Sequence, residues 1–375
     1  MIVDKTKSPM GKARPYLLLA GIPFAVLLVL VFSVPARDMQ SKLVWAYATL
    51  ILAGLFYSAA YVPFNAMVPL MTSDPIDKRR LGGLRAAAAA VGSIVVCGQT
   101  TGFVKRFGHG SEQAGFTMAS TVIGVAGALA MVFVFLICRE RPRADSPRSD
   151  DARQGLADML RNPVWLVAAG FAFAMFLRLG ALVSASLFFA RDGLKYPAAA
   201  PFLLSSLSFS ILIGSVAAPY VLARLGKKRA NVLAITIALG LTVAQVMTRD
   251  RIGLFGLFYF FANITLGIQS ATIFTLVADA VDAQEARFGG RHEGLLSSSA
   301  SFAAKIGMAI GGALIAYGLG GAGYDSAAVN DHAREGVVRM YFGGPAAFAV
   351  LQLIIIGFYR PDMHRAPTRA IARNL

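Results

Sequence analysis

Two positively charged side chains interrupt otherwise uncharged segments of this sequence. Arg178 is the only charged residue in 162–190, and Lys305 is the only one in 294–318. If these segments cross a membrane, each lone cation costs about 2.5–3.5 kcal/mol or more, so both should face the protein interior or water. Arg178 can then bind sugar hydroxyls or a phosphate, and Lys305, on one helical face with Ser301, can replace the charge of a coupling cation. The alternative for both is a structural role, through an ion pair or bonds to backbone carbonyls.

Two stripes of polar side chains follow helical spacing in apolar segments. Tyr57, Tyr61 and Asn65 recur every four residues, and Tyr259 and Asn263 are four residues apart in a corresponding segment. Aromatic faces suit the apolar faces of a sugar ring, while tyrosine and asparagine tips bond its hydroxyls. The stripes therefore predict a substrate cavity, with hydrogen bonding between helices as the alternative for any single residue.

A third set of charged residues lies at the ends of the apolar segments. We predict that its acidic and basic members form ion pairs that break and reform as a gate; the alternative is solvated helix ends. The set comprises Asp74, Asp77, Arg85, Asp279, Asp282, Arg291, Arg14 and Arg229.

Ten long apolar segments must position these residues. Each has 19 residues or more, about the length of helix that crosses a bilayer, and unpaired backbone amides in lipid require helices. The sequence therefore predicts an all-α membrane protein with ten transmembrane helices. The segments are 15–36, 43–73, 86–104, 113–138, 162–190, 196–223, 230–248, 252–278, 294–318 and 340–359.

The composition and the charge distribution agree with this prediction. Hydrophobic residues make up 56% of the chain, charged residues 15%, and the mean hydropathy is +0.61. The net charge of +16 does not indicate nucleic-acid binding, because Lys and Arg concentrate in alternate loops, beginning with the N-terminal one. That alternation places both termini in the cytoplasm. No embedded residue set indicates an intramembrane enzyme, a metal site or a cofactor site.

The loop motifs occur twice, in the same order. Gly11–Arg14 corresponds to Gly226–Arg229, and Asp74–Asp77 corresponds to Asp279–Asp282. Such a repeat predicts a duplicated helical bundle. The second copy has two apolar segments before its Gly-Lys loop, whereas the first copy begins almost at that loop. We therefore expect that two helices, roughly fifty residues, are missing from the first copy, by real loss or by an overlooked upstream start.

Several of these motifs resemble one transporter family. Residues 4–15 and 62–70, and residues 278–282 with 290–294 and Lys305, resemble loops and helix ends of the glycoside–pentoside–hexuronide:cation symporters. These form the melibiose-permease branch of the major facilitator superfamily. The similarity runs from residue 1 to about residue 360. The sequence departs from the pattern in two respects. Tyr61 occupies the position at which melibiose permease has an acidic residue, and the chain lacks the helix that carries most of the family's cation ligands.

The resemblance implies a transporter that works by alternating access. Its members move sugars or glycosides with Na⁺, Li⁺ or H⁺, and the same branch includes lysophospholipid carriers. We therefore expect a monomeric, cation-coupled sugar or glycoside symporter in a bacterial inner membrane, with no cofactor beyond the coupling Na⁺ or H⁺. The alternatives are an amphiphile symporter and an inactive truncated carrier. The expected divisions are a four-helix half in 1–138, a linker in 139–162, a six-helix half in 163–360 and a tail in 361–375.

Overall fold

The protein divides into two compact units, Met1–Ser146 and Pro147–Leu375, each described here by itself. Of the 375 residues, the computed structural model describes the following ranges: 14–35, 38–71, 102–108, 111–138, 152–196, 199–288, 293–324 and 329–360. It also describes a few positions between residues 88 and 100.

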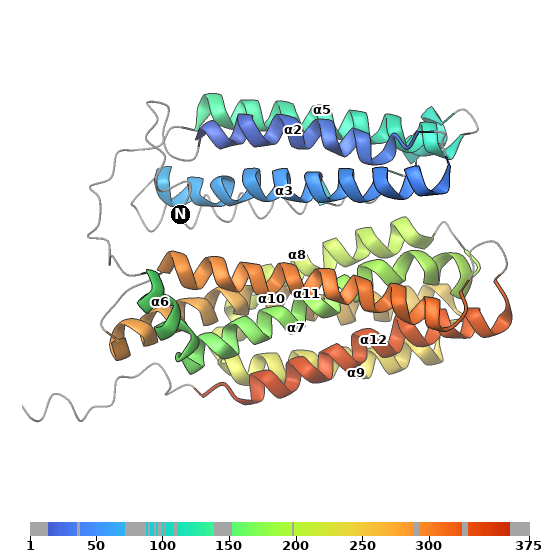
Figure 1. Ribbon diagram of the computed structural model, residues 1–375. Helices are drawn as coiled ribbons and strands as arrows, with labels where there is room; N and C mark the ends of the chain where they lie inside the picture. The colour runs from blue at the N-terminus through green and yellow to red at the C-terminus, as the bar shows by residue number, and fades with distance from the viewer. Residues whose placement is uncertain are drawn as a thin grey trace, which may run out of the picture. The chain divides into compact units, whose positions relative to one another are not determined.

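The N-terminal unit contains three long described helices, α2 (Arg14–Phe32), α3 (Met39–Met71) and α5 (Glu112–Ile137). Helix α2 packs against both α3 and α5 (Figure 1). Ser111 caps the start of α5, where its hydroxyl accepts a hydrogen bond from a free backbone amide of the first turn. The three helices are strongly apolar, as membrane helices must be.

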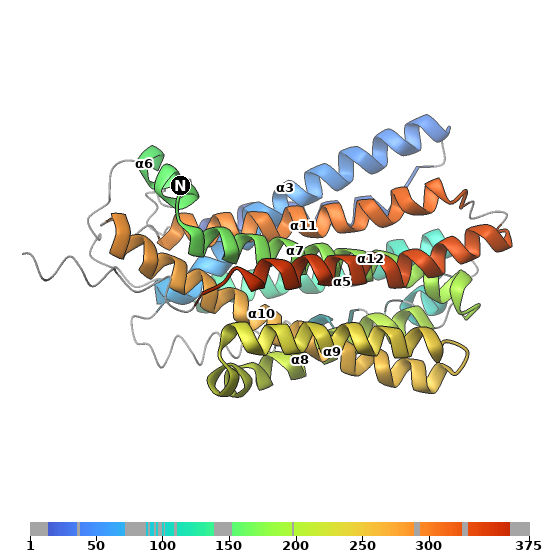
Figure 2. The same ribbon diagram turned by 90° about the horizontal axis from the view of Figure 1, so that it is seen from below.

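The C-terminal unit is a bundle of six long helices with two short additions, and its long helices run side by side (Figures 1 and 2). The elements are α6 (Ala152–Leu160), α7 (Pro163–Phe188), the π-helix η1 (Phe189–Gly193), α8 (Ala199–Leu225), α9 (Lys227–Met247), α10 (Ile252–Phe288), α11 (Glu293–Gly321) and α12 (Asp331–Gly357). The short helix α6 lies where the sequence predicts a surface helix before Pro163. It belongs to this unit and contacts α7, α10 and α11.

Helix α7 is the central element of the bundle. It packs most extensively on α11 and also contacts α10 and α12. At the contact with α11, a Cβ atom on Gly307 would collide with the carbonyl oxygen of Phe173, and one on Gly311 with that of Leu177. The G-x-x-x-G spacing therefore allows the two backbones to touch, as predicted for a pair of membrane helices.

The first turn of α7 is fixed by Asn162. Its side-chain oxygen accepts hydrogen bonds from the amides of Val164 (3.0 Å) and Trp165 (3.3 Å), and Pro163 needs no partner because it lacks an amide hydrogen. The side-chain nitrogen of Asn162 donates to the carbonyl oxygen of Ala280 on α10 (2.7 Å). One fully buried residue thus starts α7 and fastens it to α10.

In the part of the chain that the structure describes, nine helices are long and apolar enough to cross a membrane. They coincide with nine of the ten predicted segments, and the prediction of an all-α membrane bundle is confirmed for them. The remaining segment, 86–104, is described only at scattered positions, which do not make one continuous helix.

Two helices are longer than the uncharged segments that predict them. Helix α12 begins at Asp331 rather than at residue 340, and α10 continues to Phe288 rather than ending at residue 278. Charged residues outside the hydrocarbon region continue a helix when they pair along its surface. In the first turns of α12, Arg334 pairs with Asp331 at 3.1 Å and Arg339 pairs with Glu335 at 2.9 Å. An uncharged run therefore gives the membrane-embedded length, not the whole helix.

Candidate functional site

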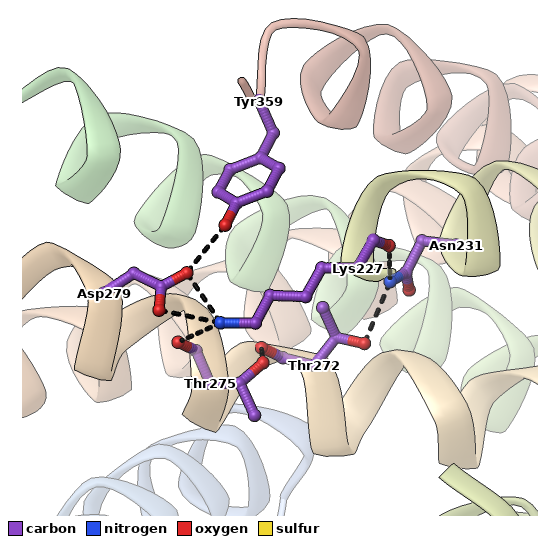
Figure 3. Close-up of polar contacts among 6 residues, drawn as sticks. All are labelled: Lys227, Asn231, Thr272, Thr275, Asp279 and Tyr359. Atoms are coloured by element: carbon purple, nitrogen blue, oxygen red, sulfur yellow. Dashed lines mark hydrogen bonds and ion pairs between the residues drawn. The ribbon is translucent and has the colours of Figure 1, made fainter. Parts of the chain in front are cut away.

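An ion pair joins the start of α9 to the last third of α10. The ammonium nitrogen of Lys227 lies 2.6 and 2.7 Å from the two carboxylate oxygens of Asp279, and it also donates to the carbonyl oxygen of Thr275 at 3.2 Å (Figure 3). The side chains are 27% and 17% exposed. This pair is more buried than a surface salt bridge, which contributes about 0–1 kcal/mol, so the loss of one partner should cost more.

A tyrosine that follows α12 completes the contact. The hydroxyl of Tyr359 donates to Asp279 at 2.7 Å, so one carboxylate connects α9, α10 and the end of α12 (Figure 3). Burial raises the pKa of Tyr359 above its usual range, and the hydrogen bond to Asp279 and the negative charge of that residue raise it further. The hydroxyl therefore remains protonated and continues to donate at physiological pH.

The sequence explains why Lys227 requires an acidic partner. Gly226 is the only residue between α8 and α9, and its φ of 74° lies in the left-handed region that glycine adopts without strain. Three cations, Lys227, Lys228 and Arg229, follow directly in the first turn of α9. The N-terminus of a helix carries partial positive charge, so cations there are unfavourable and the carboxylate of Asp279 offsets them.

The next turn fixes the register of α9 against α10. The side-chain nitrogen of Asn231 donates to the carbonyl oxygen of Lys227 (2.7 Å) and to the hydroxyl oxygen of Thr272 (2.9 Å) (Figure 3). Both Asn231 and Thr272 are fully buried. We call Lys227, Asn231, Thr272, Thr275, Asp279 and Tyr359 the Lys–Asp network. A separation of α9 from α10 would break its ion pair.

The C-terminal unit contains a cavity of about 20 Å³, lined by side chains of α7, α9, α10 and α12. Its polar lining consists of Arg178, Thr242, Gln245, Tyr259, Asn263 and Tyr341. Pockets for drug-sized ligands usually measure roughly 300–1,000 Å³, so this cavity is too small for a sugar. It admits one particle about the size of a water molecule or a monatomic ion.

Comparisons with known proteins agree with this architecture. The model of the family described as MFS/sugar transport protein matches residues 1–362. The chain belongs to this family. It is 28% identical to the isoprimeverose transporter of Lactiplantibacillus pentosus, over 96% of this chain and 77% of that protein. It is 31% identical to the putative glycoside/cation symporter YagG of Escherichia coli (strain K12), over 84% of this chain and 69% of that protein.

A solved structure shows the same fold. A bacterial homolog of the human lysosomal transporter Spinster, in an inward-facing and unoccupied conformation, has a TM-score of 0.59 at 14% identity. The match covers 95% of this chain and 83% of that chain. The protein is a multi-pass membrane protein of the major facilitator fold, as the sequence predicts.

Three of the residues predicted to bind substrate line the cavity. Arg178, Tyr259 and Asn263 are 4%, 1% and 2% exposed. The position of Arg178 in the protein interior agrees with the expectation for a cation within a membrane span. Asn263 donates to the carbonyl oxygen of Tyr259 at 2.8 Å, a bond within α10.

The other predicted binding residues lie elsewhere. Lys305 and Ser301 are both exposed on α11, and the hydroxyl of Ser301 donates to the carbonyl oxygen of Ser297 at 3.0 Å. In the N-terminal unit, the rings of Tyr57 and Tyr61 stack at 5.2 Å and are partly exposed. The side chain of Asn65 is outside the described residues. The substrate roles of these residues stay predictions.

Among the predicted gating residues, Asp279 is the one placed in the Lys–Asp network. Its partner is Lys227 rather than Arg229, which is exposed two residues later on α9, and Asp282 is exposed on α10. Arg14 donates to the carbonyl oxygen of Phe135, and its guanidinium carbon lies 4.8 Å from the centre of that ring. The residues outside the described part of the chain are Asp74, Asp77, Arg85 and Arg291.

The sequence prediction missed several polar residues. Lys227 belongs to the repeated Gly-Lys motif, so the motif contained a signal for it, but three adjacent cations do not show which one faces α10. Tyr359 is the last residue of the final apolar segment, and Tyr341 and Gln245 are uncharged residues within helices. Nothing in their local pattern separates them from the other tyrosines and glutamines.

Proposed function

We propose that this protein is a secondary transporter that couples the movement of a sugar or glycoside across a bacterial inner membrane to Na⁺ or H⁺. The observation that carries the proposal is the family match over residues 1–362, together with relatives that are an isoprimeverose transporter and a putative glycoside/cation symporter. A bundle with repeated halves suits alternating access, in which one half rocks against the other around a substrate.

In this proposal the Lys–Asp network is a latch of the C-terminal unit. It holds α9, α10 and the end of α12 together through one carboxylate, Asp279. When these helices separate during the cycle, the ammonium and the carboxylate must each gain water or a new partner. The difference in free energy between the latched and unlatched states then sets how often the transporter opens at this end. The basic Gly-Lys loop places this end in the cytoplasm by the positive-inside rule.

The proposed substrate contacts include the exposed polar face of α11. Lys305 lies well inside the membrane span Leu295–Gly321, where a cation facing lipid would cost about 2.5–3.5 kcal/mol or more. Its exposure therefore favours a position against an aqueous cavity rather than hydrocarbon. Ser301 is one turn away and offers a hydroxyl to the same cavity. The stacked rings of Tyr57 and Tyr61 provide the kind of aromatic surface on which a sugar ring packs.

The proposal is tested by uptake into proteoliposomes that contain the purified 375-residue chain. Isoprimeverose, a β-glucoside and a glucuronide are supplied outside, with an inward gradient of Na⁺ or of H⁺ imposed separately. We expect at least one glycoside to accumulate with one gradient, and the accumulation to collapse when an ionophore dissipates that gradient. Lys305→Ala should lose this uptake, whereas the exposed α12 variant Arg339→Gln should keep it.

Two results contradict the proposal. The first is the absence of gradient-dependent uptake for all three glycosides from vesicles in which the protein is correctly folded. The second is gradient-driven uptake of a lysophospholipid that none of the glycosides inhibits, which would identify an amphiphile carrier.

A further inference from the structure

The small cavity in the C-terminal unit contains hydrogen-bond donors that its own side chains leave unused. Nη1 of Arg178 and the hydroxyls of Tyr259 and Tyr341 make no hydrogen bond of good geometry in the described part of the structure. The hydroxyl of Ser186 lies near that of Tyr259 but donates to the carbonyl oxygen of Leu182. Arg178, Tyr259 and Tyr341 line the same cavity and come from α7, α10 and α12. A buried donor without a partner costs roughly 1–3 kcal/mol, and more when it is charged, so three such donors at one cavity indicate an occupant that accepts hydrogen bonds.

The positive charge at this cavity also lacks a counter-charge. Within the described residues, no carboxylate lies at ion-pair distance from Arg178. A guanidinium does not lose its proton in proteins, so Arg178 cannot escape the cost of burial by becoming neutral. A bound anion would supply the missing negative charge.

Two neighbouring polar groups already donate elsewhere. The hydroxyl of Thr242 donates to the carbonyl oxygen of Ala238 at 2.8 Å, and the amide of Asn263 donates to the carbonyl oxygen of Tyr259. The donors that remain at the cavity come from the guanidinium, the two phenols and the side-chain amide of Gln245. Converging donors around a cation form a site for an anion.

The volume of the cavity limits the size of the anion. A volume of about 20 Å³ exceeds the roughly 10–15 Å³ that one water molecule requires and excludes a phosphate or a sugar acid. We propose that Arg178, Tyr259 and Tyr341 bind a single halide ion, chloride in the cell, in the interior of the C-terminal unit. The ion neutralises Arg178 and ties α7, α10 and α12 together. This site is separate from the transported sugar and does not depend on the proposed symport.

The experiment measures the melting temperature of the purified protein in detergent as chloride replaces methanesulfonate at constant ionic strength. Methanesulfonate is larger than a halide and is not a sugar acid, so it serves as the inert anion. A ligand that binds only the folded state stabilises it by mass action, and we expect the melting temperature to rise by on the order of several degrees and then saturate. Bromide should substitute for chloride, and sulfate should not.

Three variants assign the effect to the cavity. Arg178→Gln should lose the chloride dependence, because it removes the cation. Tyr341→Phe keeps the aromatic stack on Phe189, whose ring centre lies 3.8 Å away, and removes only a hydroxyl; it should raise the chloride concentration at half-saturation about tenfold. Arg339→Gln removes an exposed arginine from the same helix and should behave like the wild type.

The outcomes separate the possible occupants. A melting temperature that does not respond to chloride in the wild-type protein overturns the proposal and identifies water as the occupant. A response that persists unchanged in Tyr341→Phe and Arg178→Gln also overturns it, because chloride then binds elsewhere. If Arg178→Gln does not fold, the comparison of Tyr341→Phe with Arg339→Gln decides the matter alone.

Discussion

The two ends of the C-terminal unit both contain a tyrosine that donates to an aspartate, yet the two contacts differ in what they connect. At one end, Tyr359 donates to Asp279 at 2.7 Å, and the cation that pairs with Asp279 is Lys227, 52 residues away in the sequence. At the other end, Tyr324 donates to Asp192 at 2.6 Å, and the cation paired with that carboxylate is its neighbour Arg191, at 3.3 Å.

In the proposed transport cycle, this difference bears on which end opens more readily. The pair between Lys227 and Asp279 joins two helices, so it breaks when those helices separate. The pair between Arg191 and Asp192 lies within η1 and survives any movement of η1 as a body. Among the described residues, Tyr324 donates to the side chain of Asp192, and Arg334 on α12 donates to its backbone oxygen at 3.1 Å. If the Lys–Asp network acts as a latch, we expect its end of the unit to be the more strongly held.

The matched variants Asp279→Asn and Asp192→Asn give the strongest test of the difference between the two ends. Asp279→Asn leaves Lys227 without its charged partner, and hydrogen bonds to charged groups contribute about 1.5–3 kcal/mol. We expect the initial rate of gradient-driven uptake to change about tenfold or more in Asp279→Asn and only a fewfold in Asp192→Asn. Equal effects of the two variants, at equal amounts of folded protein, would remove the distinction between the ends.

A double-mutant cycle tests whether Lys227 acts through Asp279. Lys227→Met and Asp279→Asn should each lower the free energy of unfolding of the unit. The double variant should lose less stability than the sum of the two single losses, because either change alone already removes the ion pair. The expected coupling free energy is about 1–3 kcal/mol, measured by chemical unfolding in detergent. Additive effects would show that the pair contributes nothing.

The tyrosine hydroxyls give a smaller effect that refines the comparison. Tyr359→Phe and Tyr324→Phe each remove one hydrogen bond to a carboxylate and keep the ring. Because Asp279 retains Lys227, Tyr359→Phe should lower uptake only a fewfold. Tyr324→Phe should change uptake at least as much as Tyr359→Phe does. It removes a direct hydrogen bond between η1 and the turn that follows α11. A large loss in Tyr359→Phe alone would show that the hydroxyl, not the ion pair, holds the latch.

The smallest expected effect is the response to alkaline pH. Burial, the hydrogen bond to Asp192 and the charge of that residue raise the pKa of Tyr324 to about 12, above its usual value near 10. The folded protein therefore binds the phenolic proton more tightly than the unfolded chain does. The stability from this group is complete below pH 10 and is lost between pH 10 and about 12. Melting temperatures should be insensitive to this tyrosine from pH 7 to 9, and Tyr324→Phe should flatten the decline above pH 10.

The membrane helices could be predicted from the sequence because charge is excluded from hydrocarbon. The same rule could not show that α12 begins at Asp331, because charged residues continue a helix once it leaves the membrane. For the site, the repeated motifs indicated Asp279 and its loop. They could not select Lys227 over Arg229, since that choice depends on which side of the first turn of α9 faces α10.

The cavity shows a different limit. Arg178 was recognisable as a lone cation that must face inward, and its burial agrees with this. Its surroundings depend on how α9 and α12 pack beside α7, and neither Tyr341 nor Gln245 has a local sequence signal. The volume of the cavity could not be predicted from the sequence either. For that reason the sequence suggested a sugar as the ligand of Arg178.

Asn162 also links α7 to the turn of α10 that carries Asp279. Its side-chain nitrogen donates to the carbonyl oxygen of Ala280, the residue directly after Asp279, while its side-chain oxygen accepts from the first turn of α7. A displacement of the start of α7 relative to α10 would therefore strain a hydrogen bond one residue away from the carboxylate that pairs with Lys227.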